Sequence, residues 1–91
     1  MNAASPQEPQ MTELTEKEAL LENAGYRYHF GRMIYFNRGS RKAFSLEFVE
    51  DHSREEIQHL IDEPPQDHGW AFYFNEPPSD GIKRQLANAF E

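Results

Sequence analysis

A chain of 91 residues, of which 37% are apolar and 27% charged, predicts one small folded domain. Its formal net charge is -7. The chain has no cysteine, which excludes a disulfide framework and a cysteine nucleophile and favours a cytoplasmic location. No apolar run approaches the roughly 18 residues of a membrane span, and the first ten residues lack the features of a signal peptide, so we expect neither membrane insertion nor export.

The N-terminal segment offers little to bury. It is rich in alanine, serine, proline, glutamine and glutamate, so the entropy of ordering it would go uncompensated. We therefore predict a disordered tail over residues 1–14 and a single domain over residues 15–91. Met11 lies just ahead of this domain, so either Met1 or Met11 fits as the natural start.

A first helix of about ten residues is predicted to begin at Thr15, because Thr15 and Glu18 have the spacing of a capping box. Leu20 and Leu21 fall on one face of it. Gly25 follows as a left-handed stop.

The stretch from Tyr26 to Val49 predicts two hairpins, because aromatic and β-branched residues alternate with polar ones. A two-residue turn at Gly31-Arg32 pairs Tyr28 with Tyr35, and a loop over residues 38–41 pairs Tyr35 with Phe44. Both turns place the large residues on one aromatic face, which is expected to carry Tyr26, Tyr28, Phe30, Met33, Tyr35, Phe44, Leu46 and Phe48. The other face is mixed and expected to be half exposed, with Arg27, His29, Ile34, Phe36, Ala43, Ser45 and Glu47.

The second half predicts two more helices around a fourth strand. A capping box at Ser53–Glu56 opens the second helix, which Pro64 ends, and Ser79 caps the third. The strand between them, residues 70–74, should run parallel to the preceding strand, beside either the first or the third strand. The element order α-β-β-β-α-β-α thus predicts an α+β, two-layer fold: one mixed sheet of about four strands with the helices on its aromatic face.

Charge is distributed unevenly along the chain. Residues 26–46 hold five bases and no acid, whereas residues 47–91 hold eleven acids and three bases. The hairpins would gather most of these bases at one end of the sheet, as a basic rim. Acids are predicted to cluster around the second helix, namely Glu50, Asp51, Glu55, Glu56, Asp62, Glu63 and Asp67.

These features favour a non-catalytic interaction module that binds a protein partner or associates with itself. The predicted contact residues lie on the mixed sheet face and its rim: Arg27, His29, Ile34, Phe36, Arg38, Arg41 and Lys42. A second interpretation is a nucleic-acid or anion binder that uses the same basic rim. A third is an acidic inhibitor, of the immunity-protein type, that docks through the second helix.

Catalysis and cofactor binding are not expected. The four histidines lack the i, i+4 spacing of helical zinc sites, no serine is framed by glycines at a strand-to-helix elbow, and the five glycines are isolated. We therefore predict no metal, no cofactor and no small-molecule substrate.

Overall fold

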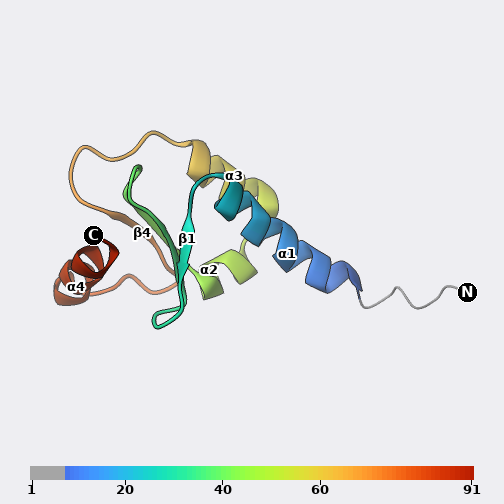
Figure 1. Ribbon diagram of the computed structural model, residues 1–91, viewed down its shortest axis with the longest axis horizontal. Coiled ribbons are helices and arrows are strands. Elements are labelled where there is room, and N and C mark those ends of the chain that lie inside the picture. The colour runs from blue at the N-terminus through green and yellow to red at the C-terminus, as the bar shows by residue number, and fades with distance from the viewer. Residues whose placement is uncertain (1–7) are drawn as a thin grey trace, which may run out of the picture.

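The computed structural model describes residues 8–91 as four helices around a four-stranded sheet (Figure 1). In chain order the elements are α1 (Glu8–Asn23), β1 (Arg27–His29), β2 (Ile34–Asn37), β3 (Lys42–Ser45), α2 (Leu46–Asp51), α3 (Arg54–Asp62), β4 (Ala71–Tyr73) and α4 (Asp80–Phe90). The predicted α+β class with one mixed sheet is confirmed. Residues 1–7 of the predicted tail lie outside the described residues. None of the helices described is both long enough and apolar enough to cross a bilayer.

Helix α1 starts earlier than the sequence pattern predicted and ends where it predicted. It begins at Glu8, so residues 8–14 are helical and Thr15 lies inside the helix instead of capping it. Strong helix formers fill this segment, and a proline in the first helical turn costs no hydrogen bond. At the other end Gly25 has a φ of 95°, and the amides of Gly25 and Tyr26 donate to the carbonyls of Glu22 and Leu21. These two bonds form a Schellman motif.

The strand order is β1-β2-β3-β4, with two antiparallel pairs followed by a parallel one. The predicted register is confirmed, because Tyr35 lies opposite Tyr28 on one side and Phe44 on the other. Strand β4 pairs in parallel with β3, which settles its place beside the third strand. β3 and β4 can be parallel neighbours because the chain returns through α3 between them.

The first hairpin loop is longer than predicted. β1 ends at His29 and β2 begins at Ile34, so Phe30, Gly31, Arg32 and Met33 form a loop in place of a two-residue turn. Met33 has a φ of 54°, and its amide donates to the carbonyl of His29 at 2.8 Å. This loop carries Phe30 and Met33 past the end of the sheet, so their predicted place on the buried face is wrong: they are 85% and 59% exposed.

The third strand is also shorter than predicted, because helix α2 replaces its second half. Ser45 caps this helix by accepting a hydrogen bond from the amide of Phe48 at 3.1 Å. The spacing of Phe44, Leu46 and Phe48 suits a strand, but Leu46 and Val49 are three apart and suit a helix equally well. The serine cap decides between them, and Val49 becomes fully buried.

The caps predicted for the two later helices are confirmed. α3 has the full capping box, with Ser53 and Glu56 bonded reciprocally, and it ends at Asp62 just before the prolines. Ser79 caps α4 by accepting a hydrogen bond from the amide of Ile82.

The sheet is covered on both faces (Figure 1). Helices α1, α2 and α3 cover the aromatic face, where the core holds Leu21, Tyr26, Tyr35, Phe44, Val49 and Ile57. Helix α4 covers the other face, where its Leu86 and Phe90 form a cluster with Ile34, Ala43 and Trp70. The predicted placement of the helices therefore holds for α1 and α3 and is wrong for α4, because the second face carries enough apolar surface to need a cover of its own.

One hydrogen bond ties α1 to the sheet and makes stability depend on pH. The hydroxyl of Tyr35 donates to Oε2 of Glu18 at 2.6 Å. Burial, together with this bond, raises the pKa of Tyr35 above its usual range. A group whose pKa is raised on folding contributes stability that is complete below its unfolded pKa of 10.0 and is lost as the pH rises further.

Tyr35→Phe is accordingly expected to cost about 1 kcal/mol at neutral pH, because one buried hydrogen bond is lost. Above pH 10.0 the wild type loses the proton-linked part of its advantage and the variant does not, so the difference should shrink. Urea denaturation of both proteins at neutral and alkaline pH measures this. A stability difference independent of pH would contradict it.

Candidate functional site: an acidic helical face and an apolar hollow

Two of the contact residues predicted on the mixed sheet face and its rim are buried, and a third is half-buried. Ile34 is only 5% exposed and lies under α4. Phe36 is half-buried, with its ring stacked on that of Phe90 at a centroid distance of 4.5 Å. Lys42 is 2% exposed. The expectation of a half-exposed sheet face is therefore wrong, because α4 covers it.

His29 also belongs to this packing. Its ring is half-buried and lies 6.1 Å from that of Phe90 and 6.4 Å from that of Phe36, measured between centroids. Its Nδ1 atom is buried and makes no hydrogen bond among the residues the structure describes. The geometry gives His29 a packing role at the edge of α4.

The exposed part of the predicted rim consists of Arg27, Arg38 and Arg41. Arg27 and Arg38 line one hollow of about 370 Å³ together with Asn37, at the end of the sheet where α1 leads into β1. Arg41 lies in the same loop as Arg38 but does not line the hollow. The predicted basic rim thus exists as two arginines that share a hollow and a third nearby.

Lys42 and Lys17 have structural roles that their sequence positions conceal. The ammonium of Lys42 donates to the carbonyls of Leu60, Ile61 and Glu63, which are the free acceptors at the end of α3. Lys17 similarly donates to the carbonyls of Val49 and Glu50 at the end of α2. Cations stabilise a helix C-terminus, so each buried lysine holds a helix against the sheet or against α1.

The side of the molecule formed by α1, α2 and α3 is strongly acidic. Residues 13–23 and 46–63 together hold eleven acids against two bases, and all of these acids except Glu18 are exposed. We call this surface the acidic face. The acids predicted around the second helix therefore do gather, and α1 adds Glu13, Glu16 and Glu22 to them.

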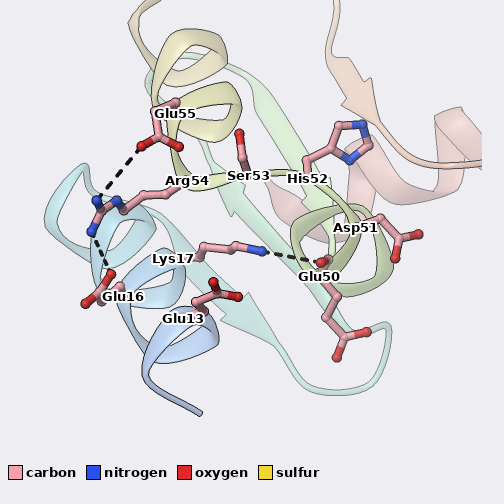
Figure 2. A pocket seen from close by; sticks show the side chains of 9 residues that line it. All are labelled: Glu13, Glu16, Lys17, Glu50, Asp51, His52, Ser53, Arg54 and Glu55. Carbon is pink, nitrogen blue, oxygen red and sulfur yellow. Dashed lines mark hydrogen bonds and ion pairs between the residues drawn. The ribbon is translucent and has the colours of Figure 1, made fainter. Parts of the chain in front are cut away.

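A first hollow on the acidic face lies where the three helices meet (Figure 2). Its two bases are already engaged, because Arg54 pairs with Glu16 at 2.6 Å and Lys17 bonds the end of α2. Within residues 13–91 no group of histidines and acids is placed to hold a metal ion. The contacts in this hollow therefore join α1 to α2 and α3, as in a packing junction between helices.

A second hollow on the same face is apolar at its centre, and we call it the α2–α3 hollow. It has a volume of about 400 Å³ and is lined by Phe48, His52, Glu55, Glu56, His59 and Leu60. The ring of His52 stacks on that of Phe48 at a centroid distance of 3.8 Å, and its Nδ1 lies 2.9 Å from the carbonyl oxygen of Phe48. These contacts fix the positions of two of the lining side chains.

Two carboxylates in the first turn of α3, those of Glu55 and Glu56, also line this hollow. Glu56 accepts a hydrogen bond from the amide of Ser53, which holds the pKa of Glu56 below its usual range and keeps it charged. The side chain of Glu55 is 80% exposed beside it. The sequence pattern located the acids but not the hollow, because it placed Phe48 on a strand instead of on a helix.

The loop of residues 30–33, which we call the hairpin tip, is the second apolar feature of the surface. Phe30 and Met33 are the most exposed of the large apolar residues described, and Arg32 lies between them in the sequence. The tip projects beyond the end of the sheet, at the bottom of the view in Figure 1.

No protein-family model, curated protein or solved structure matches this chain.

Proposed function

We propose that this protein is a non-catalytic protein-binding module whose contact surface is the α2–α3 hollow within the acidic face. The observation that carries the proposal is an apolar hollow of about 400 Å³ inside a surface of eleven acids and two bases. A partner suited to it presents an apolar side chain flanked by lysines or arginines. The absence of cysteine from the chain supports a cytoplasmic location for such a module.

The two parts of the surface would contribute differently to binding. Desolvating an apolar anchor against Phe48 and Leu60 supplies affinity, because binding energy concentrates in a few buried contacts. The surrounding carboxylates speed the encounter with a basic partner and orient it. The contacts that hold His52 on Phe48 reduce the entropy lost on binding.

The titratable groups of the hollow have structural partners, which supports binding in preference to proton transfer. Glu56 closes the capping box of α3, His52 contacts the end of α2, and His59 lies 3.3 Å from Glu63. The proposed site is the one that the third interpretation of the sequence named, since it lies along the predicted second helix, α3. Covering a basic surface of another protein is the action that such a site would perform.

Affinity capture from cells tests this proposal with a double variant that makes the hollow basic. Glu55→Lys/His59→Lys changes two lining residues whose side chains are 80% and 75% exposed, so the fold should persist. We expect partners captured by the wild type to be lost by this variant, and retained by Glu76→Lys, which reverses an acid outside the hollow. The same set of proteins on the wild type and the double variant would exclude the α2–α3 hollow as the binding surface.

A nucleic-acid or anion binder is the second candidate, favoured by Arg27 and Arg38 lining one hollow. Such binding releases counterions, so affinity for an oligonucleotide would fall steeply with salt, and replacing both arginines with alanine would reduce that slope. The net charge of -7 would repel the polymer elsewhere on the protein, which is why we place this function second.

A further inference from the structure

We propose that the occupant of the α2–α3 hollow is the hairpin tip of a second copy of this chain. This inference rests on the proposed function and names its partner. The two surfaces are complementary in both apolar character and charge, and they lie on the same chain. The protein would then associate head to tail.

The hairpin tip has the chemistry that the hollow requires. Phe30 is 85% exposed and Met33 is 59% exposed, and Arg32 carries a positive charge between them. The tip belongs to the stretch of residues 26–46, which contains five bases and no acid. Large aromatic residues this exposed at the end of a projecting loop are typical of contact anchors.

The hollow offers the matching groups. Phe48 and Leu60 provide apolar surface, while Glu55 and Glu56 provide the charge opposite to that of Arg32. The hollow has a volume of about 400 Å³ and is open to solvent, so an aromatic side chain can lie against its apolar centre.

The contact is between copies, because the exposure of Phe30 shows that it does not occupy the hollow of its own chain. Tip and hollow are different patches, so the interface is heterologous: each copy uses its tip on one neighbour and its hollow on another. Such contacts form closed rings or open chains, according to the rotation between neighbours.

Sedimentation of the full chain from about 10 µM to about 1 mM tests the inference. We expect the average mass to rise with concentration for the wild type. Phe30→Ala or Glu55→Lys/His59→Lys should weaken association by about 30-fold, because each removes one half of every contact. Ile82→Ala removes an apolar residue of α4 that is 44% exposed, and Glu76→Lys reverses an acid that does not line the hollow, so both should associate as the wild type does.

Mixing the two defective variants gives the most specific result. Phe30→Ala retains the hollow and Glu55→Lys/His59→Lys retains the tip, so together they should form dimers and nothing longer. Arg32→Glu serves as a second tip variant and should behave as Phe30→Ala does. A wild type that is monomeric throughout, or tip variants that associate like the wild type, would overturn the inference.

A separate probe distinguishes failure of this inference from failure of the proposed function. The probe is a labelled synthetic peptide with one phenylalanine between four lysines. If the wild type is monomeric but binds this peptide and the double variant does not, the second copy is excluded while the binding hollow stands. If neither association nor peptide binding occurs, both are excluded.

Discussion

Phe44→Ala is expected to reduce the free energy of unfolding by about 3 to 5 kcal/mol, which is most of the stability of a small domain. Phe44 is fully buried at the centre of the sheet. Its ring lies 4.7 Å from that of Tyr73 and 5.5 Å from that of Tyr26, measured between centroids. Truncation leaves a cavity between the sheet and three helices that cannot close without moving several elements. Urea denaturation followed by circular dichroism measures the loss.

Ile82→Ala provides the matched control, because Ile82 is apolar but 44% exposed. Its effect should stay within about 1 kcal/mol. Equal denaturation midpoints for Phe44→Ala and the wild type would show that Phe44 is not at the centre of the core, and the register of β2, β3 and β4 would then be wrong.

Lys42→Met has the second largest expected effect, a loss of about 2 to 3 kcal/mol. Methionine can fill the buried stem but cannot donate, so the carbonyls of Leu60, Ile61 and Glu63 lose a partner at the end of α3. Burial lowers the pKa of Lys42, opposed by the nearby carboxylates of Glu63 and Asp62. Removing the charge therefore recovers some desolvation energy, which is why we expect less than the cost of a large core deletion.

The comparison for Lys42 is Lys83→Met on α4, since Lys83 is exposed. We expect that change to stay within about 0.5 kcal/mol. Hydrogen exchange should show the last turn of α3 opening more often in Lys42→Met and unchanged in Lys83→Met. Equal stability of the two variants would mean that Lys42 does not hold the end of α3.

Local signals in the sequence predicted much of the fold. The caps at Ser53 and Ser79 and the stop at Gly25 depend on a few adjacent residues, and the structure has all three. The pairing of Tyr28, Tyr35 and Phe44 followed from two turns that agreed on one face. Such features need no knowledge of distant contacts.

What the sequence could not predict depends on how distant elements meet. Whether α4 packs on one face of the sheet or the other is decided by tertiary packing, since its stripe of Leu86 and Phe90 suits either face. The same uncertainty made Ile34 and Phe36 look exposed. Helix α2 was missed because its short sequence fits both a period of two and a helical spacing.

The candidate site was predicted in charge but not in shape. Acids around the second helix were visible from their positions in the sequence, whereas Phe48, His52 and Leu60 meet only after α2 forms. Lys42 was assigned to a basic rim because it lies on a strand and caps a helix that is distant in the sequence. No pattern in the residues around Lys42 indicates this role. Its exposure depends on where α3 ends.

The most direct test of the proposed function is site-specific photocrosslinking in cells, with a photoreactive amino acid placed at position 59 in one protein and at position 38 in another. His59 lies at the α2–α3 hollow and Arg38 at the basic hollow. We predict protein adducts from position 59, lost on adding Glu55→Lys, and few adducts from position 38. Nucleic-acid adducts from position 38, with none from position 59, would contradict the account.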